Sequence, residues 1–227
     1  MKYFTADYHF NHLNKKGTGI IDYCQRPFSD INQMNEMIIQ NHNDTVEKDT
    51  HEVFVLGDMG FNFPKLTSEI LPRLKGRIHL ILGNHDAKLK RYKKFMDQTG
   101  QKYLCSVQRY KEIKVDKKKV VLFHFPLLSW NAHYYGSYHL FGHCHGTMLD
   151  VPGNVQDVGI DAYARIKAGE RGKYHSEYKG GKKEDYRPFR WDEIEGLISS
   201  KPPLETPFSR WQNYLEQNFD IEGIDET

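Results

Sequence analysis

The feature that most constrains the fold is the alternation of strand-like and helix-like segments in the first half of the chain. Short apolar runs at 2–6, 53–56 and 78–82 are typical of strands. Apolar residues at helical spacing follow the first two runs, at 31–39 and 67–75. This alternation predicts βαβ units and a largely parallel sheet, in which ligand-binding groups gather at the carboxyl ends of the strands.

The second half of the chain predicts a more strand-rich arrangement. A hairpin is expected over 111–123, and further strands are expected at 138–141 and 155–160. The two halves together predict an α/β fold of two packed mixed sheets flanked by helices. A length of 227 residues fits one core and is too short for two ordinary domains with a linker. We therefore expect a single domain over residues 1–227.

Two segments stand outside this strand pattern. The segment at about 162–183 holds seven Lys and Arg residues against two Glu, and we interpret it as a basic insertion in a loop. Its cations and tyrosines would either attract a nucleotide through phosphate contacts and base stacking or merely solvate a face. Near the end, 191–198 is predicted to be helical, and apolar spacing at about 204–219 predicts a C-terminal amphipathic helix.

Composition limits the location and the partners of the protein. Lys and Arg number 32 against 30 Asp and Glu, so any field that attracts phosphate must be local. No apolar run approaches the roughly 18 residues needed to span a bilayer, and no secretory stretch opens the chain. The cysteines Cys24, Cys105 and Cys144 have unrelated spacings, which indicates free thiols in a reducing compartment. We expect a cytoplasmic protein without a membrane partner.

Five predicted strands end in residues that can bind metal ions. A single histidine at a strand end is more often a hydrogen-bonded structural residue, so the joint occurrence is the informative signal. Oxygen donors mixed with imidazoles suit Mn²⁺, Fe or Zn²⁺ and disfavour a thiolate-rich structural zinc site. Glycines that precede three of the groups are expected to let the backbone turn sharply. The groups are Asp7-Tyr8-His9, Gly57-Asp58, Gly83-Asn84-His85-Asp86, Phe123-His124 and Gly142-His143-Cys144-His145.

The order D-x-H, GD, GNHD, H, GHxH resembles the calcineurin-like metallophosphoesterase superfamily. The match runs from Asp7 to His145 without a missing element. Three further segments resemble the small single-domain phosphoesterases of bacteria and their phages: YCQRPF at 23–28, GID at 159–161 and YRP at 186–188. The resemblance implies a fold of two packed mixed sheets flanked by helices and the hydrolysis of phosphate esters. The predicted order of strands and helices agrees with that fold.

The resemblance also implies a cofactor of two divalent ions, Mn²⁺ foremost, with Fe, Zn²⁺ or Ni²⁺ as alternatives. Ions that lie roughly 3.5 to 4 Å apart need a shared anionic ligand to offset their repulsion. A water between them is acidified and attacks phosphorus, so no Ser or Cys nucleophile is needed. The implied ligands are Asp7, His9 and His145 for one ion, Asn84, His124 and His143 for the other, and Asp58 as the bridge.

The residues around these ligands have expected roles of their own. His85 would protonate the leaving oxygen or stabilise developing charge, with Asp86 orienting it, although a merely hydrogen-bonding role is the alternative. His12 and Arg26 are expected to contact substrate phosphate, unless they only order the loop. Cys144 lies between two ligands on a strand, where neighbouring side chains point to opposite faces, so we do not expect it to bind metal.

The substrate class follows from departures within the motifs. Phosphoprotein and diadenosine-type phosphatases of the superfamily carry GDxxDRG and GNHE, whereas Asp58 here precedes Met59-Gly60-Phe61 and the later motif ends in Asp86. Retention of His85 favours a phosphodiester, whose poor leaving group benefits from a proton. The expected substrate is a phosphodiester in a nucleotide or short nucleic acid. The alternatives are a phosphomonoesterase and, from another class, a non-catalytic metal-binding scaffold. The oligomeric state is not predicted.

Overall fold

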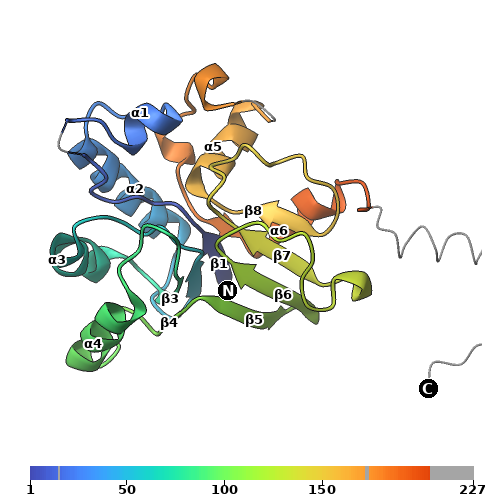
Figure 1. The fold of residues 1–227 in the computed structure, drawn as a ribbon, viewed down its shortest axis with the longest axis horizontal. Coiled ribbons are helices and arrows are strands. Elements are labelled where there is room, and N and C mark those ends of the chain that lie inside the picture. The colour runs from blue at the N-terminus through green and yellow to red at the C-terminus, as the bar shows by residue number, and fades with distance from the viewer. Residues whose placement is uncertain (15, 172–173, 205–227) are drawn as a thin grey trace, which may run out of the picture.

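The computed structural model describes residues 1–14, 16–171 and 174–204. Its first sheet has the strand order β4-β3-β2-β1-β9 (Figure 1). The pairs β1–β2, β2–β3 and β3–β4 are parallel, and β9 adds an antiparallel edge beside β1. The strands are β1 (Lys2–Thr5), β2 (Glu52–Val55), β3 (Arg77–Ile81), β4 (Ser106–Gln108) and β9 (Phe189–Arg190).

The second sheet has the order β5-β6-β7-β8. The predicted hairpin is confirmed, because β5 and β6 are antiparallel and joined at Asp116 and Lys117, with φ of 46° and 69°. Two left-handed residues suit the tight turn that matches strand twist. The later pairs β6–β7 and β7–β8 are parallel. The strands are β5 (Tyr110–Val115), β6 (Lys118–Phe123), β7 (Tyr138–Phe141) and β8 (Val155–Asp157).

Alternating side chains divide the core into layers. On β1, Tyr3 belongs to the apolar cluster shared with the helices, whereas Phe4 belongs to the cluster that lies between the two sheets. Val53 and Phe54 on β2 divide in the same way. Figure 1 shows the second sheet on one side of the first and α2, α3 and α4 on the other. The predicted fold class, two mixed sheets flanked by helices, is confirmed.

The helices begin where the sequence supplies capping groups and apolar spacing. In α2, the carboxylate of Asp30 accepts hydrogen bonds from the N–H groups of Asn32 and Gln33, and Met34 and Ile38 face the core. None of the helices in the described part of the chain is long and apolar enough to cross a bilayer. The helices are α1 (Ile20–Cys24), α2 (Ile31–Thr45), α3 (Phe63–Lys65), α4 (Leu89–Thr99), α5 (Ile160–Ala168) and α6 (Trp191–Ser199).

Two predicted helices differ in extent from the structure. The helix expected at 67–75 is irregular: α3 continues as a π-helical turn at Leu66–Ile70 and a 3₁₀ turn at Leu71–Arg73. Pro72 lies in that last turn and supplies no backbone N–H. The C-terminal helix expected at about 204–219 lies outside the described residues from 205 onward.

The interpretation of 162–183 as a loop is wrong for its first part. The strand expected at 155–160 ends at Asp157, and α5 then runs to Ala168, where left-handed Gly169 closes it. Arg165 is also buried rather than solvated, with its guanidinium 4.2 Å from the ring centre of Tyr178. Side chains here turn inward because the helix packs against the core, which the cationic composition did not indicate.

Candidate metal centre

The polar strand ends meet at one edge of both sheets. The N–H groups of Asp7 and His9 donate to the carbonyls of Gly57 and Asp58, both at 3.0 Å, and tie the loop after β1 to the loop after β2. The His143 N–H donates to Asp7 Oδ2 at 2.9 Å and brings in the loop after β7. Parallel pairing thus brings together groups that are far apart in sequence.

Five of the predicted ligands have a left-handed backbone. The φ values are 58° at Asp7, 53° at His9, 51° at Asp58, 70° at His143 and 47° at His145. In a residue other than glycine this conformation costs on the order of 1 kcal/mol or more, so the surrounding fold must impose it. Strand and helix periodicity gives no signal of it.

The glycines before the ligands serve two purposes. Gly57 makes the expected sharp turn, with φ of 92°. Gly83 and Gly142 do not have positive φ and are needed for close approach. A Cβ on Gly83 would lie 2.2 Å from Asp58 Oδ1, and one on Gly142 would lie 2.4 Å from Ala6 Cβ. At these two positions the absence of a side chain, and not a left-handed backbone, lets the ligand loops lie close together.

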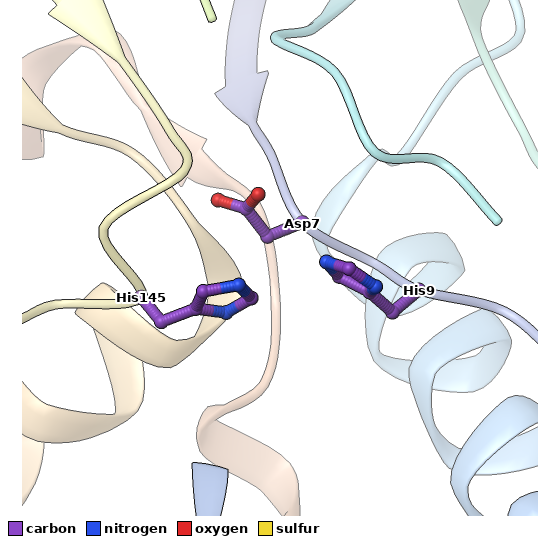
Figure 2. A group of neighbouring side chains, drawn as sticks. All are labelled: Asp7, His9 and His145. Atoms are coloured by element: carbon purple, nitrogen blue, oxygen red, sulfur yellow. The ribbon is translucent and has the colours of Figure 1, made fainter. Parts of the chain in front are cut away.

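Asp7, His9 and His145 form the first group that could hold a metal ion, with ligand atoms within 4.8 Å of one another. Figure 2 shows the two imidazoles beside the carboxylate. Asp7 Oδ1 and His9 Nε2 are buried without a hydrogen-bond partner, which is costly unless a cation satisfies them. His9 Nδ1 lies 3.0 Å from His12 Nδ1, and His145 Nδ1 lies 2.7 Å from Asp161 Oδ2. These bonds leave both Nε2 atoms for an ion.

Asp7, Asp58 and His124 form a second such group. Asp58 Oδ2 lies 3.6 Å from His9 Nε2 and 3.5 Å from His124 Nε2, between the two expected ligand sets. His124 Nδ1 donates to the Leu56 carbonyl at 2.7 Å, which turns Nε2 toward Asp58 and toward the side-chain oxygen of Asn84 at 3.0 Å.

The remaining ligand of the second set lies at the rim. His143 is exposed, and its ring centre is 5.2 Å from that of His124. The residues expected for the second ion are therefore neighbours, with His124 buried and both Asn84 and His143 exposed.

The electrostatics of the groups fit a cation. Burial raises the pKa of Asp7 to about 7, against a lowering by the charges of His145 and His124. Burial would lower the pKa of His124, but its hydrogen bond to the Asp58 carboxylate and the charge of Asp7 raise this pKa to about 8. Buried acids that lack sufficient positive charge are the environment that a divalent ion stabilises.

His85 lies over the first group but is not oriented by Asp86. The His85 ring is exposed, its centre is 5.5 Å from that of His9, and its N–H donates to Asp58 Oδ1 at 2.9 Å. The Asp86 carboxylate instead accepts from the N–H groups of Gly83, Asp58 and Met59 at 2.8 to 3.0 Å. Asp86 holds the loops that carry the ligands, so its expected orienting role does not fit this geometry.

His12 lies beside the site against Phe61, a residue that the motif analysis did not select. Their rings are stacked with centres 4.1 Å apart. Burial, and then the neighbouring charge of His85, lower the pKa of His12 to about 4, so the ring is neutral near pH 7. Any contact of His12 with phosphate would be that of a neutral hydrogen-bond donor.

Arg26 does not face the open side of the site. Its guanidinium is buried and bonded to Asp161, to the carbonyls of Asp7 and Tyr8, and to the Met34 sulfur. The expected contact of Arg26 with substrate phosphate does not fit this burial.

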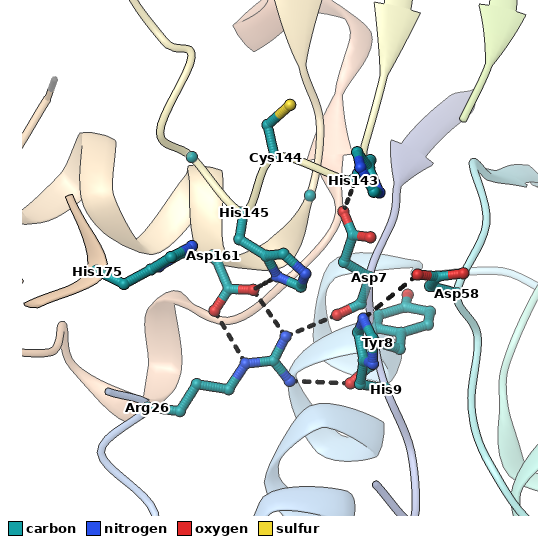
Figure 3. Close-up of polar contacts among 12 residues, drawn as sticks. Asp7, Tyr8, His9, Arg26, Asp58, His143, Cys144, His145, Asp161 and His175 are labelled. Atoms are coloured by element: carbon teal, nitrogen blue, oxygen red, sulfur yellow. Dashed lines mark hydrogen bonds and ion pairs between the residues drawn. The ribbon is translucent and has the colours of Figure 1, made fainter. Parts of the chain in front are cut away.

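Two other side chains complete the surroundings. Figure 3 shows Cys144 directed away from the imidazole of His145, and its Sγ lies 3.3 Å from Met148 Sδ. His175, from the basic insertion, approaches His145 with ring centres 5.9 Å apart. Motif analysis missed this histidine, because no local pattern marks a loop that folds back on a distant site.

Comparison with known proteins places the chain in a family. No family model matches it. The uncharacterised protein MJ1445 of Methanocaldococcus jannaschii is 36% identical over 150 residues, which are 65% of this chain and 71% of that protein. The chain belongs to the MJ1445 family.

One solved structure similar to this MJ1445-family chain shares its fold. The protein of unknown function AQ665 from Aquifex aeolicus has a TM-score of 0.51 and 22% identity, and covers 87% of this chain and 99% of its own. An archaeal phosphodiesterase is similar more loosely, with a TM-score of 0.43 and 15% identity over 74% of this chain and 87% of its own.

Proposed function

We propose that this chain is a metal-dependent phosphoesterase with two adjacent ion positions, and that it hydrolyses a phosphodiester in a nucleotide or short nucleic acid. The observation that carries the proposal is the pair of ligand groups that share Asp7, with Asp58 between their histidines. The unpartnered buried atoms of Asp7 and His9 support occupancy of the first position by a cation.

In this proposal, one set of residues binds the ions and another residue donates a proton. Asp7, His9 and His145 would hold one ion, His124 with Asn84 and His143 the other, and Asp58 would contact both. When bound, divalent ions supply Lewis-acid activation of water and neutralise charge at phosphorus. His85 is exposed at the mouth of the site, where its ring can reach a leaving oxygen and donate a proton.

The preference for a diester as substrate rests on the resemblance of the GNHD motif, in which His85 is retained. His85 can protonate a leaving alkoxide, which leaves poorly without a proton. Diesters and monoesters both release such a group, so a phosphomonoesterase activity is the second candidate.

The test is turnover of bis-p-nitrophenyl phosphate and p-nitrophenyl phosphate by chelator-treated protein with and without added Mn²⁺. We expect Mn²⁺-dependent turnover with the diester preferred, and we expect Asp58→Ala to abolish it. Preference for the monoester would overturn the diester assignment. Turnover of neither substrate would favour a non-catalytic scaffold. A screen of cyclic mononucleotides, cyclic dinucleotides and short oligonucleotides would then identify the natural class.

A further inference from the structure

We propose that Arg26 and Asp161 form a buried positioning unit that holds Asp7, His9 and His145 and makes no direct contact with His124, Asn84 or His143. The inference rests on the metal site of the proposed function but not on hydrolysis itself. It gives Arg26 a role different from the phosphate contact expected from its sequence, and it assigns a role to Asp161.

Asp161 orients His145. Its Oδ2 accepts a hydrogen bond from His145 Nδ1 at 2.7 Å, which fixes the ring and leaves Nε2 on the side of Asp7 and His9 (Figure 3). A carboxylate behind a metal-binding imidazole also makes the imidazole a stronger electron donor. Asp161 is only 1% exposed, so water does not compete for this hydrogen bond.

Arg26 joins Asp161 to the other two ligands. Its Nε and Nη2 donate to the two carboxylate oxygens of Asp161 at 2.9 and 2.7 Å. Nη2 also donates to the Asp7 carbonyl at 2.7 Å, and Nη1 donates to the Tyr8 carbonyl at 2.9 Å. The guanidinium thereby holds the short left-handed backbone that carries Asp7 and His9 while it holds the carboxylate behind His145.

The second ligand set has different supports. His124 is oriented by the Leu56 carbonyl, and the loop of Asn84 is held by Asp86 through the Gly83 N–H. The bonds of Arg26 and Asp161 reach neither of these residues. Loss of the unit should therefore weaken one ion position selectively.

The unit requires both of its charges. The side chain of Arg26 is 0% exposed and that of Asp161 is 1% exposed, so removing one partner leaves the other charged and buried. Asp161→Asn keeps the shape of the side chain and removes its charge. Arg26→Lys keeps the charge and loses the planar fork that reaches several acceptors at once. The second variant keeps the proposal testable if the first does not fold.

The experiment is a calorimetric titration of chelator-stripped full-length protein with Mn²⁺, repeated with Co²⁺ while its visible absorption is followed. For the wild type we expect two equivalents. For Asp161→Asn and Arg26→Lys we expect one equivalent to bind about 10- to 100-fold more weakly, the usual effect of removing a partner behind a metal ligand. The other equivalent should keep its affinity, and the Co²⁺ spectrum of the weakened position should change.

Glu193→Gln is the matched control. It breaks the partly buried ion pair between Glu193 and Arg187, whose charged groups lie 2.5 Å apart. The bonds of Glu193 go to Tyr163, Arg187 and the Arg190 N–H, none of which is a proposed ligand. This variant should bind both equivalents as the wild type does. Equal weakening of both equivalents, or no weakening in either test variant, would overturn the proposal. Wild-type protein that binds two ions but hydrolyses no phosphate ester would overturn the proposed function alone, and wild-type protein that binds none would overturn both.

Discussion

At the scale of single residues, sequence neighbours in the GNHD motif have different surroundings. Asn84 directs its side-chain oxygen to His124 Nε2 at 3.0 Å, whereas the His85 ring stands open at the mouth of the site. Asp86 points inward and binds three backbone N–H groups. Under the proposed function, these three adjacent polar residues would serve an ion, a substrate and the loop itself.

Replacing His85 by alanine should keep both metal ions and lower kcat by about 10²- to 10⁴-fold, the usual contribution of a positioned general acid. The deficit should be largest for an ester with an alkoxide leaving group and smaller for one that releases p-nitrophenolate, because the alkoxide needs the proton more. Kinetics on both esters, with bound metal measured, provide the check. An equal deficit with metals intact would assign His85 to charge stabilisation, and loss of metal would make it structural.

Gly83→Ala should damage the site without removing a ligand. The new Cβ would lie 2.2 Å from Asp58 Oδ1 and 2.7 Å from the Asp58 nitrogen, so Asp58 must move. We expect lower Mn²⁺ affinity and a loss of about 1 to 3 kcal/mol in the free energy of unfolding. Metal titration and urea unfolding measure these. Gly196→Ala is the control, because its Cβ meets open space on α6. Unchanged metal affinity in Gly83→Ala would contradict this account.

At the scale of elements, α2 is tied to the site through a buried histidine. His42 Nδ1 lies 2.6 Å from the hydroxyl of Tyr8, and Nε2 lies 2.8 Å from the Lys75 carbonyl. In sequence, Tyr8 stands between the proposed ligands Asp7 and His9. A neutral ring satisfies both contacts if Nε2 donates to the carbonyl and Nδ1 accepts from the hydroxyl. Burial lowers the pKa of His42 to about 4.

This burial predicts a pH-dependent stability for metal-free protein. His42 becomes protonated below pH 6.5 in the unfolded chain, but only near pH 4 in the folded chain. The free energy of unfolding therefore falls as the pH falls from 6.5 to about 4. One unit below 6.5, the loss from this residue is about 1.4 kcal/mol. Urea unfolding at pH 7.5 and 5.5 measures it. In His42→Gln, which cannot titrate at this position, the free energy of unfolding should differ less between the two pH values. A difference equal to that of the wild type would contradict the role given to His42.

At the scale of the whole molecule, the candidate centre joins two sheets. Asp7 and Asp58 follow strands of the first sheet, whereas His124 and His145 follow strands of the second. An ion that binds ligands from both sheets is bound by the folded state and not by the unfolded chain. Its binding energy therefore adds to the stability of the fold.

Added Mn²⁺ should raise the Tm of the chelator-treated protein. At a concentration 100 times its Kd, an ion adds about 2.7 kcal/mol, which for a chain of this size corresponds to roughly 5 to 10 °C. Calorimetry with increasing Mn²⁺ is the measurement. Asp58→Ala should lose most of the rise, whereas Cys144→Ser, whose thiol lies against Met148, should keep it. No rise in the wild type would count against an ion that connects the sheets.

The sequence by itself determined the longer strands, the two-sheet fold class and the chemical types at the strand ends, because local periodicity and residue type encode these directly. The short edge strands β4 and β9 were not predicted from it. Only the tertiary structure decided what Arg26, Asp86 and Asp161 contact. Arg26 and Asp161 lie 135 positions apart, and packing alone brings them together. Tertiary packing also accounts for α5 at the start of the basic insertion and for the left-handed backbone of five predicted ligands. Such features depend on long-range contacts that outweigh local preference, and a local pattern cannot report them.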